Sequence, residues 1–585
     1  MRPPTLIRAA IGPPLGSDAT RRRPIGRIGG MAGCDDPLAR ARLAAVLGPG
    51  GQLLDATRPG SLVADWDSCW SGGQPIEQLD DWQPLLSAEG LAGVDGAFAL
   101  AWVDPDGTLT LARDAVGERT LFYTQAPGGW IFASTIPALL ATGLVPRRLN
   151  AVAVATYLCY AYLPGCETLV NGLFELLPGE LLRIRGGTAV RSQYWRLPST
   201  REPSGSEGEN LEIASRALRG RLERAVARRL PAGQPVGAFL SGGLDSSLVV
   251  ALARTLHDRP VRTYSVSFGE GYANELPFSS LVADHCQTEH RIVELAPDVV
   301  LHHLDETIGL LNEPIGDPLT VPNALLFREA SAEVGVVLNG EGGDPCFGGP
   351  KNLPMVLAEL LGDGANDGLS NDADLSLGRE RSYLRAHGKC YDDLPQMLAP
   401  ELAAALQDLP LERSLTSYLT DERWPSFVAK LMALNVTFKG AHHILPKVDA
   451  LSASFGVVPR APLFDRAVVE LAVSAPPQLR LRGSVEKFLL KQAVRDLLPL
   501  SIVERPKSGM LVPVEAWFRG PLLATARERL LDGLGPYHLF ERAYLERLLA
   551  GRLGGVRPRI GQKIWLLVTL EAWLRTVFLA PIPRV

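Results

Sequence analysis

The sequence has few of the features that mark membrane-spanning, metal-binding or disulfide-bonded proteins. Its 585 residues contain no apolar run of 18 or more, so no membrane span is expected. The seven cysteines are scattered, odd in number and form no CxxC pair, which supports neither a disulfide framework nor a zinc site. A reducing, cytoplasmic location fits this cysteine usage best.

The chain also lacks a strong charge of either sign. The formal net charge is −5 with acidic and basic residues interspersed, so the basic excess of a nucleic-acid-binding protein is missing. The first residues contain arginines and prolines but no apolar segment of the kind found in signal peptides, and we expect residues 1–24 to be a disordered lead-in.

The length is too great for one hydrophobic core and predicts two or three domains. Short apolar strands and turns fill residues 25–198, including a hairpin around Asp-Pro-Asp-Gly and a second turn in "TQAPGGWIFAS". Residues 199–210 form a polar linker. From 211 to 585, helical patterns alternate with β-branched runs and predict a parallel α/β sheet, with a polar insertion at 362–376 and mostly helix after it.

One glycine-rich loop stands out, in the stretch "GAFLSGGLDSSLVV". A strand candidate, a Ser-Gly-Gly turn and a helix start place free backbone N–H groups and a positive helix-dipole end at one point, which favours a phosphate. Asp245 would repel that phosphate unless a divalent cation bridges the two. The alternative is an ordinary helix N-cap with a tight turn, where Asp and Ser are common. The loop is not a Walker A motif, because no Lys follows the glycines.

A second loop, "VGVVLNGEGGDPCFGG", has the same organisation. Loops at the carboxyl ends of parallel strands meet at one crevice, so Asp245 and Asp344 could share a Mg²⁺ ion on a pyrophosphate. The alternative is a glycine-rich turn with solvated acids. Cys346 lies beside this loop, either as a nucleophile or as a space-filling side chain.

These motifs resemble those of the ATP-pyrophosphatase superfamily and, more narrowly, the asparagine synthetase and β-lactam synthetase family. "SGGLDS", "NEPIGDPLTVPN", "LNGEGGDPCFGG", "KVDALSASFGVVPRAPLFD" and "EKFLLKQAVRDLLPLSIVERPKSGMLVPVEAWFRG" match five family motifs in order, over roughly 237 to 520. The resemblance implies an ATP-pyrophosphatase fold with a parallel sheet that adenylates a carboxylate, with ATP and Mg²⁺ as cofactors.

The resemblance also implies roles for individual residues. Glu341 would be the acid/base and Lys507 would stabilise the transition state, although in isolation that lysine would be taken for a surface residue. Asp245 and Asp344 would bind Mg²⁺. The nucleotide-binding residues implied are Leu240, Ser241, Gly242, Gly243, Asp245, Ser246, Val266, Asn339 and Gly340.

The N-terminal half is similar to the glutaminase domain of glutamine-dependent asparagine synthetases, which has a four-layer αββα N-terminal-nucleophile fold. "RDAVGERTLFYT" fits its RDxxGxxPLYY pattern. Such domains use an N-terminal Cys whose α-amino group is the base. Here Arg27 or Ile28 stands near that position, and Cys34 comes a few residues late and would need processing to become the first residue. We therefore expect glutaminase activity to be lost and the domain to persist as a scaffold.

Three functions remain open at this point. The first is amide formation from free ammonia or an external amine, as in asparagine synthetase, which Glu341 favours because β-lactam synthetases carry Tyr there. The second is intramolecular amide closure, as in β-lactam synthetase and lasso-peptide macrolactam cyclases, which the missing cysteine favours. The third is a non-catalytic scaffold. We expect a small-molecule or peptide carboxylate and an amine as substrates, no nucleic-acid or membrane partner, and either a homodimer or a biosynthetic partner protein.

Overall fold

A computed structural model describes residues 4–9, 27–200, 207–349, 377–407, 411–506, 509–554 and 558–583. The predicted insertion at 362–376 and Lys507 lie outside these residues. Residues 27–200 are called the N-terminal domain below, and residues 207–583 the C-terminal domain.

The C-terminal domain is built on one six-stranded sheet in which every pairing is parallel, as the alternation of helix and strand predicts. Its strands, in spatial order, are β1 (Thr5–Arg8), β15 (Glu289–Glu294), β14 (Val261–Ser267), β13 (Val236–Phe239), β16 (Val336–Leu338) and β17 (Val458–Arg460).

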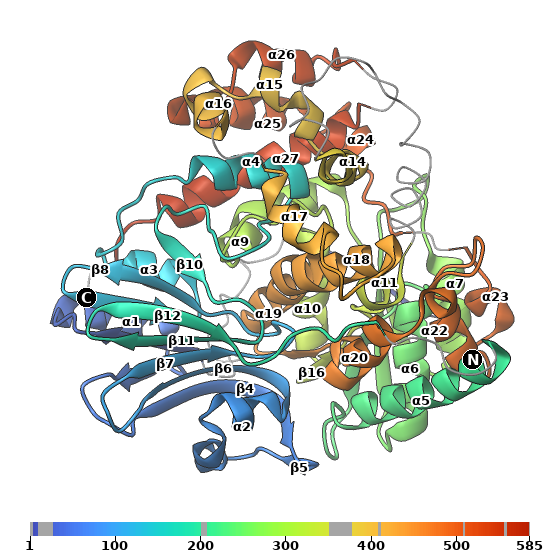
Figure 1. The fold of residues 1–585 in the computed structure, drawn as a ribbon. Coiled ribbons are helices and arrows are strands. Elements are labelled where there is room, and N and C mark those ends of the chain that lie inside the picture. The colour runs from blue at the N-terminus through green and yellow to red at the C-terminus, as the bar shows by residue number, and fades with distance from the viewer. Residues whose placement is uncertain are drawn as a thin grey trace.

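Helices cover both faces of this sheet (Figure 1). One face packs against α5 (Glu207–Ala227), α6 (Leu244–Leu256) and α7 (Leu276–Cys286) through the buried side chains of β13 and β16. The other face packs against α10 (Thr320–Ser331) and, beyond it, the C-terminal helix α27 (Ile560–Trp573). A sheet enclosed on both faces explains the continuous apolar runs of its strands.

The first strand, β1, contradicts the expected disordered lead-in. Thr5–Arg8 pairs in parallel with β15 at the edge of the sheet, Ala9 N–H donates to the Glu294 carbonyl at 3.0 Å, and Arg8 Nε lies 3.1 Å from Glu294 Oε1. The chain therefore begins in the C-terminal domain, as the N label in Figure 1 shows, before it enters the N-terminal domain. The predicted linker is also shorter than expected, because α5 begins at Glu207.

The N-terminal domain is the four-layer αββα sandwich that the resemblance implies. One sheet has the order β10 (Leu173–Glu175), β8 (Phe122–Ala126), β9 (Gly129–Ala133), β2 (Ile28–Ala32), β3 (Gln52–Asp55). The other has the order β12 (Thr188–Gln193), β11 (Glu180–Arg185), β7 (Leu109–Arg113), β6 (Val94–Val103), β4 (Leu62–Ser71), β5 (Gln74–Pro75).

Apolar side chains between these two sheets form a separate core. Outside it, α1 (Pro37–Leu47) and α3 (Ile136–Ala141) cover the first sheet, and α2 (Ala88–Ala92) covers the second. Both predicted turns are confirmed, as β6–β7 and β8–β9 hairpins.

One long helix of the C-terminal domain lies against the N-terminal domain. It runs through α18 (Phe427–Leu434), the π-helix η4 (Asn435–Ile444) and α19 (Leu445–Ala453) without a break. Wide π turns are uncommon and often occur at functional sites. No helix in the described part of the chain is long and apolar enough to cross a membrane.

Candidate active site at the carboxyl ends of the strands

The first glycine loop connects β13 to α6, as the sequence predicts. Leu240 N–H donates to the Tyr264 carbonyl at 2.9 Å, which continues the sheet by one residue. Beyond it the hydroxyls of Ser241 and Ser246 lie 3.1 Å apart, and Ser246 Oγ also reaches the Gly243 carbonyl at 3.3 Å. No side chain caps the start of α6, so its first N–H groups point at the loop unblocked by a cap. This is the arrangement that an anion needs.

The glycine at the turn cannot be replaced by a larger residue. Gly242 has φ +78°, and a β-carbon there would overlap the backbone of Phe278 and Ser279 in α7. Arg505 holds the same turn from outside: it donates to the Gly242 carbonyl at 3.1 Å, pairs with Glu275 at 2.6 Å and stacks 3.7 Å above the Phe278 ring. The loop is thus fixed on two sides.

The second glycine loop, Asn339–Asp344, follows the adjacent strand β16 and touches the first loop directly. A β-carbon on Gly340 would overlap the Ser246 backbone, and one on Gly343 would overlap the Asp245 carboxylate. The sequence-based expectation that the two loops meet is therefore confirmed, and their glycines are what allow the approach.

Asp245 and Asp344 face the same ammonium group. Lys487, at the start of α22 (Phe488–Ala493), places Nζ 2.5 Å from Asp245 Oδ2 and 2.5 Å from Asp344 Oδ1. Burial lowers the pKa of Lys487, but the two carboxylates outweigh it and hold the pKa above its ordinary range. Sequence reasoning missed this residue, although "EKFLLK" carries it.

Asp245 and Asp344 are the candidate Mg²⁺ ligands. Among the described residues no group of three or more His, Cys, Asp and Glu side chains could hold a metal. Mg²⁺ nevertheless commonly binds through one or two carboxylates together with phosphate oxygens and water, so Asp245 and Asp344 fit it in company with a phosphate.

The residues expected to line an adenosine pocket are mostly apolar, with one buried amide N–H group that lacks a hydrogen-bond partner among the described residues. Leu240 and Val266 are buried, at 1% and 4% exposure. Asn339 accepts from the Glu341 backbone N–H through Oδ1 at 3.1 Å, while its buried Nδ2 has no hydrogen-bond partner among the described residues. A buried unpaired donor is costly, and a base or ribose oxygen would satisfy it.

Glu341 belongs to the second glycine loop and is partly buried. The charged side chains of Lys447 and Asp317 influence its carboxyl. Burial raises the pKa of its carboxyl above the ordinary value, although Lys447 and Lys439 lower it. Lys447 is 2% exposed and pairs with Asp317 at 2.7 Å. The Asp317 carboxylate also lies 3.5 Å from His443 Nε2. A carboxylate with a raised pKa binds a proton more tightly than an ordinary glutamate does.

Cys346 does not look like a nucleophile. It is fully buried, its Sγ contacts the Leu463 carbonyl at 3.7 Å, and burial raises the pKa of the thiol well above its ordinary value. The space-filling interpretation therefore holds.

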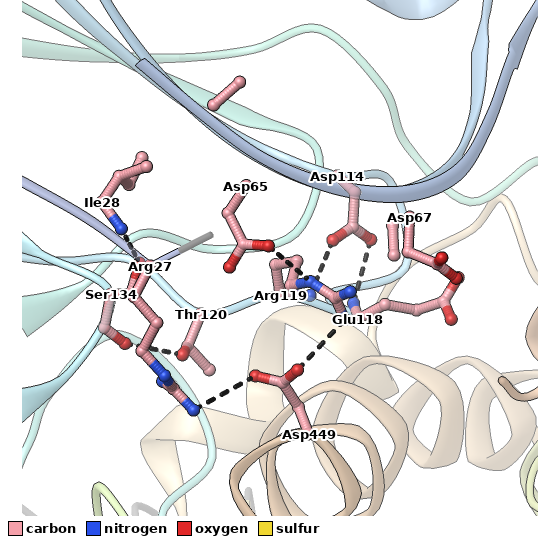
Figure 2. Close-up of polar contacts among 12 residues, drawn as sticks. Arg27, Ile28, Asp65, Asp67, Asp114, Glu118, Arg119, Thr120, Ser134 and Asp449 are labelled. Atoms are coloured by element: carbon pink, nitrogen blue, oxygen red, sulfur yellow. Dashed lines mark hydrogen bonds and ion pairs between the residues drawn. The ribbon is translucent and has the colours of Figure 1, made fainter. Parts of the chain in front are cut away.

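The position that corresponds to a glutaminase nucleophile is built into a sheet. Ile28 N–H donates to Ser134 Oγ at 3.0 Å (Figure 2), and the Arg27 carbonyl accepts from Gln52 N–H at 2.8 Å. This backbone is thus part of the sheet, and neither Arg27 nor Ile28 has a thiol. Cys34 follows the opposite end of β2, where its Sγ contacts the Pro127 carbonyl at 3.1 Å. Burial raises the pKa of this thiol too.

Comparison with known proteins agrees with both halves of the fold. The asparagine synthase family model matches residues 217–575, and the glutamine amidotransferase domain model matches 85–195. Asparagine synthetase [glutamine-hydrolyzing] 1 of Bacillus subtilis (strain 168) is 24% identical over 502 residues, 83% of this chain and 78% of the relative. A putative asparagine synthetase [glutamine-hydrolyzing] of Mycobacterium tuberculosis (strain ATCC 25618 / H37Rv) is 27% identical over 513 residues, 83% of this chain and 77% of the relative.

A third relative has a different name. Amidase chry2 of Gibberella zeae is 23% identical over 527 residues, 81% of this chain and 77% of the relative. The family match spans more than half of the chain, and it falls on the domain that contains the two glycine loops. The chain belongs to the asparagine synthase family and, with it, to the ATP-dependent amide-forming ligases.

Proposed function

We propose that the protein activates a carboxylate as an acyl-adenylate, releases pyrophosphate and passes the acyl group to ammonia or another amine. The observation that carries this proposal is the meeting of two glycine loops on Lys487, with Glu341 beside them. ATP supplies the adenylyl group and the pyrophosphate that leaves. The chain's contribution is to hold those phosphates and to move one proton.

Each loop would have its own part in holding the nucleotide. The backbone of Gly242 and Gly243 and the hydroxyls of Ser241 and Ser246 would bind the pyrophosphate, at the start of α6. Asp245 and Asp344 would hold Mg²⁺ against it. Leu240, Val266, Asn339 and Gly340 would surround the adenosine.

Positive charge would stabilise the pyrophosphate as it leaves. Lys487 is already placed between the two carboxylates. Lys507 lies outside the described residues, and its role is proposed on the resemblance alone. A fixed ammonium contributes more in a water-poor site, because the low local dielectric strengthens its attraction to developing negative charge.

Glu341 would accept the proton that the amine loses when it attacks the acyl carbon. Burial raises its pKa, which increases its affinity for that proton. The Lys447 ammonium, held in place by Asp317, would favour the ionised form of Glu341.

The nitrogen would not come from glutamine. Arg27 and Ile28 occupy the position of the N-terminal cysteine, and both backbone groups there are committed to the sheet. This supports free ammonia or an external amine as the second substrate. The same observation favours a second candidate, intramolecular amide closure, because an enzyme of that type needs no ammonia source.

One experiment separates the two candidates. ATP–pyrophosphate exchange is measured with L-aspartate and with other candidate carboxylates, and the amide product is then identified by mass spectrometry with and without ammonium chloride. An amide that forms only with ammonium would exclude intramolecular closure. An amide that forms without any added amine would exclude the use of ammonia or an external amine. If no carboxylate supports exchange, the result would favour a non-catalytic scaffold protein.

A further inference from the structure

The long helix α18–η4–α19 presents charged side chains to both domains. Lys439, His443 and Lys447 are spaced four residues apart and lie on the side of Glu341 and Asp317. His442 and Asp449 meet acidic and basic groups of the N-terminal domain instead. One rigid element thus connects the N-terminal domain to the surroundings of the proposed base.

The loop of the N-terminal domain that contacts this helix, residues 114–119, is held by several hydrogen bonds to one carboxylate. The Asp114 carboxylate accepts backbone N–H bonds from Val116, Gly117 and Glu118 at 2.7–3.1 Å and from Arg119 at 2.9 Å. At Gly117 φ is +82°, and a β-carbon there would come within 2.9 Å of the Ala441 side chain of η4. The loop therefore fits closely against the helix.

Arg119 projects from that loop and bridges two buried carboxylates (Figure 2). Its Nε lies 3.2 Å from Asp65 Oδ1, within its own domain, and its Nη1 lies 3.1 Å from Asp449 Oδ1 in α19. Arg27 approaches the same Asp449 carboxylate at 4.0 Å. The side chains of Arg119, Asp65 and Asp449 are each only 6% exposed, so this pairing is shielded from water.

Arg113 makes a second contact between the domains, about two turns earlier along the helix. It is fully buried, donates to the Ala441 carbonyl at 3.1 Å and pairs with Glu175 at 2.8 Å. Glu175 in turn lies 2.8 Å from His442 Nδ1. The Arg113 guanidinium thus supplies a donor from the N-terminal domain to a backbone carbonyl of η4.

We propose that Arg119 is a positioning residue for the amide-forming step: through Asp449 it fixes the helix on which Lys447 stands behind Glu341. This inference rests on the proposed function. It gives the N-terminal domain a role that needs no glutamine hydrolysis. Asp449 lies two residues after Lys447, so a shift or rotation of α19 moves the ammonium relative to both Asp317 and Glu341.

The size of the effect follows from how sharply proton transfer depends on geometry. A misplacement of about 1 Å can cost about 100-fold in rate. Removing Arg119 also leaves Asp65 and Asp449 as buried carboxylates that repel each other, and the burial of Asp65 already raises its pKa to about 6. Adenylation depends on the glycine loops, which Arg119 does not touch.

The test uses the full chain and three variants. Arg119→Met removes the bridge, and Asp449→Asn removes only the charge on α19 at nearly constant shape. The matched control is Arg466→Met, which also breaks contacts between the domains: Arg466 Nη1 donates to the Ala92 and Val94 carbonyls at 2.6 and 2.9 Å. Its helix α20 (Arg466–Ser474) carries no group beside Glu341.

The first measurement needs no substrate. Amide hydrogen exchange of residues 435–453 is expected to rise in Arg119→Met and in Asp449→Asn and to stay unchanged in Arg466→Met. Wild-type protection of this segment in both bridge variants would overturn the inference, and so would an equal loss in the control, which would mean general loosening.

The second measurement separates the two chemical steps, with L-aspartate, ATP and ammonium chloride as probes. Arg119→Met is expected to keep pyrophosphate exchange within about threefold of wild type and to lose about 10- to 100-fold in amide formation. Hydroxylamine is largely unprotonated near neutral pH and is a stronger nucleophile than ammonia, so water can take up the proton that it loses on attack. It should therefore restore product. Exchange and amide formation falling together, or hydroxylamine failing to help, would overturn the role.

The two proposals fail in different ways. If the wild-type chain makes no amide from any carboxylate, the proposed function fails while hydrogen exchange still decides whether Arg119 fixes the helix. If the wild-type chain is active and Arg119→Met makes amide at the same rate, the positioning role fails alone.

Discussion

Lys487 forms a buried ion pair with Asp245, at 2.5 Å, across 242 residues of sequence. The same Nζ reaches Asp344 from the second glycine loop, so one ammonium group holds together two segments that would otherwise repel each other. This pairing holds the two glycine loops together before any nucleotide binds.

Replacing Lys487 tests this organisation. Lys487→Met should lower ATP–pyrophosphate exchange by at least about 100-fold, because a fixed charge at the leaving group is lost. It should also destabilise the domain by about 3–5 kcal/mol, because two neighbouring carboxylates lose the ammonium that offsets their repulsion. Exchange and denaturant unfolding measure the two effects. Lys430→Met on α18, whose Nζ donates to the Leu419 carbonyl at 2.7 Å, is the matched control and should leave exchange unchanged; a similar loss there would show that the effect is not specific to the charge at Lys487.

The contact between the two glycine loops gives a second prediction. Gly340→Ala should abolish exchange while the chain stays folded, because the added methyl group overlaps the Ser246 backbone and forces the loops apart. Gly220→Ala in α5 is the control: nothing lies within 4 Å of its β-carbon, and the helix should gain up to about 1 kcal/mol. Normal exchange by Gly340→Ala would mean that the loops do not need their close approach.

The nitrogen source gives a third prediction, on the N-terminal domain. L-glutamine should give no amide product above background, whereas ammonium chloride should give product, because Arg27 and Ile28 offer no thiol near the expected nucleophile position. Cys34→Ala should leave the ammonium-dependent rate unchanged, since that thiol lies at the far end of β2 with a raised pKa. Glutamine-dependent product that disappears in Cys34→Ala would contradict this and restore a processed nucleophile.

Local sequence predicted the features that depend on local chemistry. Each glycine loop carries its own turn residues, so "SGGLDS" and "NGEGGD" predicted their strands, their helix starts and their meeting at one edge of the sheet. The roles of Lys487 and Arg119 could not be found this way, because each is defined by partners hundreds of residues distant. A lysine before "FLLK" has the pattern of a solvated side chain until two buried carboxylates face it.

The strand β1 was missed for a related reason. "TLIR" is short, lies among prolines and arginines and has no turn partner nearby, so its sequence carries no strand signal of its own. It forms a strand because the edge of β15, which is distant in sequence, offers backbone groups for pairing. Edge pairing of this kind depends on the tertiary fold rather than on the segment.

The proposed base gives the last prediction, a pH dependence with a definite sign. Glu341 acts as a base only when ionised, and burial raises its pKa, so amide formation should fall as the pH is lowered through a value above the ordinary glutamate range. Lys447 and Lys439 are the cations that lower this pKa, and Asp317 and Asp344 are the anions that raise it. Lys447→Met removes a cation and leaves Asp317 uncompensated, so the acid limb should move to higher pH.

Rate–pH profiles of amide formation with saturating ammonia and L-aspartate measure this shift. Glu341→Gln should lower the rate by about 100- to 10,000-fold, remove the acid limb and leave pyrophosphate exchange in place, because adenylation does not require the base. Lys430→Met, on α18 of the same helix, is the control: its Nζ donates to the Leu419 carbonyl at 2.7 Å and faces no group of the site. An acid limb that stays in Glu341→Gln, or that does not move in Lys447→Met, would assign the proton to another residue.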